Sequence, residues 1–217
     1  VFHYNSISGN GYGVVNYETG YGDPTVVMDG ALNWWGSADG PYFDPWDGGA
    51  AYAGGGDAVY GNVIFSPWLG TDPDGDAGTA GVQITGPVVI VVDDVGPAPA
   101  GGYLDAAIGG SNDAMLPYED AIIVMDGDYT VSTALTDGVT LTSDCGACKT
   151  SITGSLAVNA DNTTIGRIRE GFAVHGPITI GTGVDAGTIH INWNDIYGSV
   201  TNNGTGRLDA AFNDWGA

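Results

Sequence analysis

Three acidic side chains alternate along one short segment, Asp72-Pro73-Asp74-Gly75-Asp76. Ca²⁺ is a hard cation that prefers oxygen ligands, and alternating aspartates let one loop bring several carboxylates to one ion. An EF-hand is excluded because no glutamate follows at the bidentate position. The pattern makes Asp72, Asp74 and Asp76 candidate calcium ligands, and a solvated acidic turn is the alternative. The sequence requires no other cofactor.

The two cysteines stand three positions apart, in Cys145-Gly146-Ala147-Cys148. A redox enzyme carries such a pair at the start of a helix in a βαβ unit, whereas this pair lies between two strand-like stretches. Two thiolates supply only half of a tetrahedral zinc site. We therefore expect Cys145 and Cys148 to be oxidised in an exported protein, with a disulfide inside the turn or between subunits.

Two Asn-x-Thr sequons begin at Asn162 and Asn203 and are compatible with glycosylation. The chain starts at Val1 without methionine, which favours a mature form from which a signal peptide has been removed. Both features favour an extracellular or cell-surface location.

Large aromatic side chains are candidates for a sugar-binding platform. They are Trp34, Trp35, Trp46, Trp68, Trp193 and Trp215, with Tyr42, Phe43 and Tyr52. Because most lie in a motif that closes a repeat, we expect packing in the core or at an interface.

The elements that must position these residues are short strands. Segments of three to five apolar or β-branched residues, such as Ile122-Ile123-Val124 and Leu156-Ala157-Val158, alternate with Gly, Asn and Asp. Such strands are too short for a large sandwich, and their spacing suits a parallel solenoid with turns at glycine and asparagine. Asn159, Asn194 and Asn213 are expected to stack at the corners.

Charge excludes several kinds of partner. The 217 residues contain 26 acidic and only 4 basic side chains, which gives a formal net charge of −22. This charge disfavours nucleic acid and polyanionic substrates such as pectate. No apolar run is long enough to span a membrane. Charged residues are 14% of the chain, which favours a surface partly covered by neighbouring subunits.

The most informative pattern is a repeat at the two extremes of the chain. Residues 208–216 (LDAAFNDWG) repeat residues 28–36 (MDGALNWWG), and residues 191–196 (INWNDI) repeat residues 2–7 (FHYNSI). A solenoid coil buries its edge only against another coil, so matching ends favour head-to-tail stacking. The repeats place His3 and His190 at neighbouring positions, which alone is weak evidence for copper or zinc.

Residues 119–217 resemble the opening and middle of right-handed parallel β-helix surface proteins, the pectate-lyase-like and periplasmic copper-protein-like solenoids. Residues 28–69 resemble the ending of these proteins, through Asn33-Trp34-Trp35-Gly36, Gly40-Pro41 and the segment from Gly56 to Leu69. The resemblance implies an all-β, right-handed parallel β-helix but no particular chemistry. The order is permuted, because the ending comes first. A neighbouring subunit, or the chain's own other end, would restore the usual order.

Polygalacturonase-like enzymes share that fold, and three fragments are similar to their catalytic pieces. These are Asp93-Asp94, His175-Gly176 and Arg167-Ile168-Arg169. Their order differs, and no Asn-Thr-Asp is present. We expect no enzyme, and we expect Arg167 and Arg169 to share one face of a strand and pair with acidic neighbours.

The sequence therefore predicts closing coils at residues 1–70, an acidic Gly/Pro connector with one buried strand at 71–118, and further coils at 119–217. The expected function is a secreted structural protein that polymerises with itself into a sheath, such as an archaeal sheath, a surface layer or an extracellular fibre. Subunit contacts are expected at Phe2, Tyr4, Ile7, Trp193, Phe212 and Trp215. A carbohydrate-binding or adhesive module, in contact with cell-envelope glycans, and a polysaccharide lyase or hydrolase are the alternatives.

Overall fold

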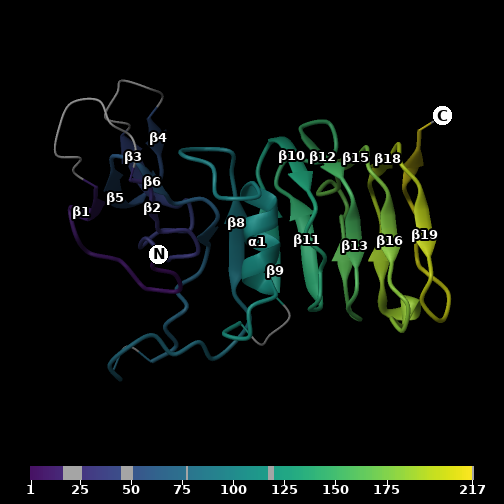
Figure 1. Cartoon of the computed structure of the whole chain (residues 1–217), viewed down its shortest axis with the longest axis horizontal. Helices are drawn as coiled ribbons and strands as arrows, with labels where there is room; N and C mark the ends of the chain where they lie inside the picture. The colour runs from purple at the N-terminus through teal and green to yellow at the C-terminus, as the bar shows by residue number, and fades with distance from the viewer. Residues whose placement is uncertain (17–25, 45–50, 77, 117–119, 217) are drawn as a thin grey trace.

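The computed structural model describes residues 1–16, 26–44, 51–76, 78–116 and 120–216. The protein is built almost entirely of short strands that stack in parallel, as Figure 1 shows along the long axis of the molecule. The predicted all-β parallel solenoid is thus confirmed. No helix in these ranges is long and apolar enough to cross a membrane.

The described strands of residues 1–70 are called the N-terminal coils and lie at the left of Figure 1. Their strands are β1 (Tyr12–Val15), β2 (Met28–Asp29), β3 (Pro41–Asp44), β4 (Tyr52–Ala53), β5 (Gly56–Tyr60), β6 (Val63–Ile64) and β7 (Trp68–Leu69). β1, β5, β3 and β4 form one sheet in that order, and β2 pairs with β6 in parallel.

The solenoid extends from β8 to the last described residues. Its first elements are β8 (Val89–Val92), α1 (Tyr103–Ser111), β9 (Asp120–Val124), β10 (Gly127–Val131), β11 (Val139–Ser143) and β12 (Thr150–Gly154). Its later elements are β13 (Leu156–Val158), β14 (Thr164–Ile165), β15 (Ala173–Val174), β16 (Ile178–Ile180), the 3₁₀ turn η1 (Ala186–Thr188), β17 (His190–Ile191), β18 (Asp195–Ile196), β19 (Val200–Asn202) and β20 (Asp214–Trp215).

Three sheets form the walls of the solenoid. Their strand orders are β17-β14-β11-β9-β8-β7, β10-β12-β15-β18-β20 and β13-β16-β19. Within a wall, buried apolar residues alternate with partly exposed ones. The register places apolar side chains of one coil on those of the next, as where Leu156 pairs with Ile178 and Val158 with Ile180. Because side chains alternate between the two faces of a strand, this pattern fills the interior with stacked aliphatic side chains.

A column of glycines fixes one corner of the solenoid. A Cβ atom would lie 2.1 Å from the Val131 carbonyl oxygen at Gly154, 1.5 Å from the Gly154 oxygen at Gly176, and 2.1 Å from the Gly176 oxygen at Gly198. No other residue fits where the backbones of successive coils approach this closely. The glycines therefore set the corner that the sequence pattern predicted.

Helix α1 closes the first end of the solenoid. It packs against β8, β9 and β10 and buries Leu104, Ala107 and Ile108. Asp105 anchors it, accepting hydrogen bonds from the backbone N–H groups of Ser132 and Thr133 at 2.8 Å. The sequence pattern did not predict this helix, which lies in the expected connector.

The N-terminal coils and the solenoid are not one continuous coil. Strand β7 pairs with β8 antiparallel, through Trp68 with Val91 and Leu69 with Ile90. Successive turns of a single solenoid place parallel strands side by side, so this reversal marks the joint between two stacks. In Figure 1 the N-terminus lies among the N-terminal coils and the C-terminus at the far end of the solenoid, so the two marked termini do not meet.

Candidate assembly interface

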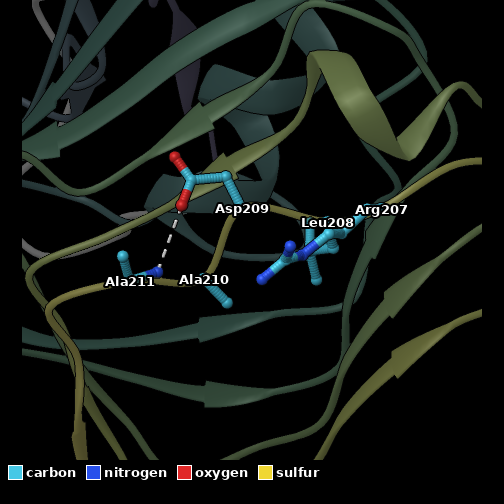
Figure 2. A pocket seen from close by; sticks show the side chains of 5 residues that line it. All are labelled: Arg207, Leu208, Asp209, Ala210 and Ala211. Carbon is cyan, nitrogen blue, oxygen red and sulfur yellow. Dashed lines mark hydrogen bonds between the residues drawn. The ribbon is translucent and has the colours of Figure 1, made fainter.

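The last described coil of the solenoid, residues 207–216, lies at the right of Figure 1 and is called the open end. This open end pairs with the preceding coil through Asp214 with Asp195 and Trp215 with Ile196. A hollow of about 530 Å³ faces outward there and is lined by residues 207–211 (Figure 2). Nothing among the described residues covers this end, whereas α1 covers the other.

Exposed aromatic side chains surround the open end. The exposed fractions of Trp193, Phe212 and Trp215 are 41%, 71% and 51%. The rings of Trp193 and Phe212 stack, with centroids 4.8 Å apart and planes 11° from parallel. This apolar surface would gain stability from being covered.

The repeat noticed in the sequence is a repeated set of hydrogen bonds. In the C-terminal corner, residues 190–196 with 208–216, the Asn213 Nδ2 donates to Ile191 O at 2.6 Å and Ala210 O at 3.0 Å. Asn213 Oδ1 accepts from the Asn194 N–H at 2.9 Å. These bonds join two successive coils through one amide side chain.

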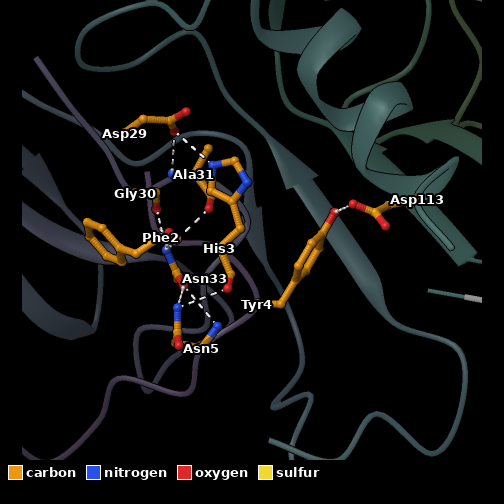
Figure 3. A network of polar contacts seen from close by, with 9 residues as sticks. All are labelled: Phe2, His3, Tyr4, Asn5, Asp29, Gly30, Ala31, Asn33 and Asp113. Carbon is orange, nitrogen blue, oxygen red and sulfur yellow. Dashed lines mark hydrogen bonds and ion pairs between the residues drawn. The ribbon is translucent and has the colours of Figure 1, made fainter. Parts of the chain in front are cut away.

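The N-terminal corner, residues 1–7 with 28–36, makes the same bonds (Figure 3). Asn33 Nδ2 donates to Phe2 O at 2.7 Å and Gly30 O at 2.8 Å, and Asn33 Oδ1 accepts from the Asn5 N–H at 2.9 Å. An aspartate accompanies each corner, with Asp29 3.0 Å from the His3 ring and Asp209 3.0 Å from the His190 ring.

Backbone conformation repeats as well. Tyr4 and Trp193 have φ angles of 58° and 64°, and Leu32 and Phe212 have 57° and 59°. Left-handed backbone at bulky residues is uncommon and is held here by the surrounding bonds. The two corners are therefore one structural unit present twice.

The copies differ in what surrounds them. Tyr4 is buried, and its hydroxyl donates to Gly110 O at 3.4 Å and lies 3.3 Å from Asp113 Oδ2, at the end of α1. Leu32 also packs there, and a Cβ at Gly110 would lie 2.7 Å from Leu32 Cδ1. The chain's own helix thus covers the Tyr4 side chain, and the predicted subunit contact at this residue stays a prediction for its backbone.

Phe2 and Ile7 are likewise used inside the molecule, where both pack in the cluster that contains Trp35. The Phe2 and Trp35 rings meet edge to face, with centroids 6.5 Å apart. Of the predicted contacts, only Trp193, Phe212 and Trp215 present exposed side chains. Sequence reasoning missed this asymmetry because only the position of α1 reveals it.

Comparison of the chain with family models, curated proteins and solved structures gave no significant match. The fold and its exposed ends are therefore the basis for any functional assignment.

The aspartates of the predicted calcium loop bond to their own turns. Asp72 Oδ1 accepts from Asp74 N–H and Asp74 Oδ1 from Asp76 N–H, both at 3.1 Å, and Asp76 Oδ2 accepts from the Thr79 hydroxyl at 2.6 Å. The bonds from Thr79 and then Gly78 lower the pKa of Asp76. No group of three or more ligands for a metal gathers among the described residues, so the calcium site stays a prediction without a formed ligand set.

Cys145 and Cys148 are both exposed free thiols in the structure. The turn between them is closed instead by backbone bonds from Lys149 and Thr150 to Gly146 O. A disulfide within the turn is absent, and one between subunits stays a prediction. Asn162 and Asn203 are exposed, so both sequons are accessible.

Most of the aromatic residues of the closing motif pack inward. Trp35, Phe43 and Trp68 are buried, whereas Tyr42 is 41% exposed; Trp46 lies outside the described residues.

The fragments similar to catalytic pieces are spread over several coils. Asp93 follows β8, whereas His175 follows β15. The rings of His175 and Tyr197 stack, with centroids 4.7 Å apart. Arg167 and Arg169 lie in the turn between β14 and β15, so the prediction that they share a strand is wrong; Arg169 has a φ angle of 67°.

Two carboxyls, the half-buried Asp93 and the buried Asp120, have raised pKa values. Burial raises the pKa of Asp93 to about 6, and the charges of Asp94 and Asp126 act in the same direction. Burial also raises the pKa of Asp120 to about 6; its Oδ1 accepts from Val88 N–H, whereas its Oδ2 is buried without a partner. Neither lies at the open end.

Proposed function

We propose that this protein is a structural subunit that assembles end to end with copies of itself by stacking β-solenoid coils. The product is a sheath, surface layer or extracellular fibre. The observation that carries the proposal is the repeated corner, which is covered by further chain at the N-terminal copy and uncovered at the C-terminal copy.

What covers the N-terminal copy shows what the C-terminal copy lacks. The N–H groups of Met28, Gly30 and Leu32 donate to Asn62 O, Ile64 O and Pro67 O in the next coil. Their counterparts, Leu208, Ala210 and Phe212, have no acceptor among the described residues. An edge with unpaired N–H and C=O groups is a template for adding another strand.

The edge carries little that would prevent such an addition. Natural edge strands are commonly protected by lysine, proline or a covering element. Within residues 208–216 the charged side chains are Asp209 and Asp214, and Asp209 already pairs with His190. The net charge of −22 opposes close approach of subunits, so screening by salt or cations would favour assembly.

An adhesive, carbohydrate-binding role is the second candidate. The flat faces of the Trp193–Phe212 and His175–Tyr197 stacks are exposed surfaces of the kind that sugar rings pack against. Retention of soluble protein on polysaccharide columns, lost in Trp193→Ala, would favour this role over assembly. An enzymatic role has less support, because the carboxyls with raised pKa values, Asp93 and Asp120, lie on the early coils and not at the hollow.

Assembly is tested by blocking the free edge. The Ala210 N–H has no partner in the described part of the chain, so Ala210→Pro removes no hydrogen bond seen there but places a ring where the next strand must bind. We expect wild-type protein to form polymers visible by negative-stain microscopy and A210P to stay soluble with the same far-UV circular dichroism.

The matched control is Gly30→Pro, at the equivalent position of the N-terminal copy. The Gly30 N–H donates to Ile64 O at 2.9 Å, so this variant should lose stability. Polymers of A210P like those of wild type would contradict the proposal.

A further inference from the structure

We propose that the strand added at the open end is residues 1–7 of a second copy, in the one register that places its Asn5 on Asn213. This inference rests on the proposed function and names the surface and register of its contact. The register follows from the hydrogen bonds that each of the two corners makes, or lacks, to an adjacent coil.

Three of the hydrogen bonds that join the C-terminal corner to the coil before it come from groups with counterparts in the N-terminal corner. Asn192 N–H donates to Ile165 O at 3.0 Å, and Asp195 N–H donates to Phe172 O at 2.9 Å. The Phe172 N–H in turn donates to Asn194 Oδ1 at 3.0 Å. Two backbone donors and one amide oxygen therefore recognise the preceding coil.

The N-terminal corner carries the same three groups without partners. The equivalents of Asn192, Asn194 and Asp195 are His3, Asn5 and Ser6. The N–H groups of His3 and Ser6 and the Oδ1 of Asn5 have no hydrogen-bond partner among the described residues. This edge thus presents three groups that a further coil would pair and that the described part of the chain leaves unpaired.

The open end offers the missing partners. Asp195 pairs with Ala173 in the coil before it and with Asp214 in the coil after it. Asn213 would therefore stand beneath the added strand as Phe172 stands beneath residues 191–196. Its N–H and C=O groups have no partner among the described residues. They would bind Asn5 Oδ1 and the Ser6 N–H of the second copy, while Ala210 O accepts from His3 N–H.

The result is an unbroken asparagine ladder. Within one chain Asn194 bonds to Asn213 and Asn5 bonds to Asn33. Stacking Asn5 on Asn213 joins these pairs into a row of four across the junction. Stacked asparagines satisfy one another's amides along a column of parallel strands, and a shift of two residues would break the row.

Disulfide trapping tests this register. In a Cys145→Ser, Cys148→Ser background, Ser6→Cys with Asp214→Cys places two thiols on adjacent strands, about 4.8 Å apart at Cα and within disulfide range. Ser8→Cys with Asp214→Cys is the control shifted by two residues. Asp195→Cys with Asp214→Cys, which are paired within the chain, shows that such neighbours can be oxidised.

We expect oxidised S6C/D214C polymers to give a ladder of covalent multimers on a non-reducing gel, at least tenfold more than S8C/D214C. Polymers that form but trap S8C/D214C equally well, or trap neither pair, would overturn the register and leave the proposed function standing. A cysteine-free background that forms no polymer in the microscope would overturn both.

Discussion

The two asparagines of the repeated corner should respond unequally to the same substitution. Asn33 is fully buried and donates to Phe2 O, Gly30 O and Ala31 O, while Asn213 is partly exposed at the open end. Asn33→Ala removes these three hydrogen bonds to carbonyl oxygens and a fourth from the Asn5 N–H. At about 1 kcal/mol for each bond, we expect a loss of about 4 kcal/mol in the free energy of unfolding.

Asn213→Ala should cost the monomer only about 1 kcal/mol, because water reaches the groups that it releases. Its larger effect should be on assembly, where the site becomes enclosed. A loss of about 1.4 kcal/mol there raises the critical concentration for polymerisation about tenfold.

Urea denaturation of protein kept monomeric by low salt measures the first effect, and light scattering against concentration measures the second. Equal destabilisation by the two substitutions would refute the inference that one corner is enclosed and the other open. An unchanged critical concentration for polymerisation of Asn213→Ala would refute the place of Asn213 in the contact between subunits.

Four further outcomes are expected. Burial raises the pKa of Asp120 to about 6, so ionisation of its carboxyl should lower the free energy of unfolding as pH rises from about 4 to about 6. Asp120→Asn should raise the urea midpoint at pH 8 and weaken this pH dependence. An unchanged urea midpoint would contradict the prediction. Phe212→Ser should leave the unfolding midpoint within error and weaken assembly, and a wild-type critical concentration would count against the interface. If the loop of Asp72, Asp74 and Asp76 holds calcium, a chelator should lower the melting temperature of the wild type but not of Asp74→Asn. No heat of binding when calcium is titrated into the protein would favour the solvated acidic turn. Polymers treated with oxidant should show disulfides between chains at Cys145 or Cys148 by mass spectrometry, and two free thiols would reject this prediction.

The sequence pattern predicted features that depend on local chemistry. Gly and Asn at regular intervals indicated the corners, and the stacking of Asn194 with Asn213 is confirmed by the hydrogen bond between them. The LDAAFNDWG repeat predicted two equivalent ends, and the structure shows the same bonds at Asn33. These features follow from residues close in sequence or from a repeat visible by inspection.

Features that depend on tertiary contacts were not predictable in this way. Helix α1 has only nine residues and ends in Gly109-Gly110-Ser111, so its pattern is weak. Gly110 is explained by the approach of Leu32, which lies far away in sequence. The burial of Tyr4 by the same helix could not be seen from the repeat, whose other copy leaves Trp193 exposed.

Sedimentation velocity of residues 1–217 over a series of protein and salt concentrations tests the central claim most directly. We predict a series of species above the 22.1 kDa monomer that grows with both concentrations, because each junction adds one subunit and salt screens their charge. A single 22.1 kDa species under all conditions would contradict assembly through the open end.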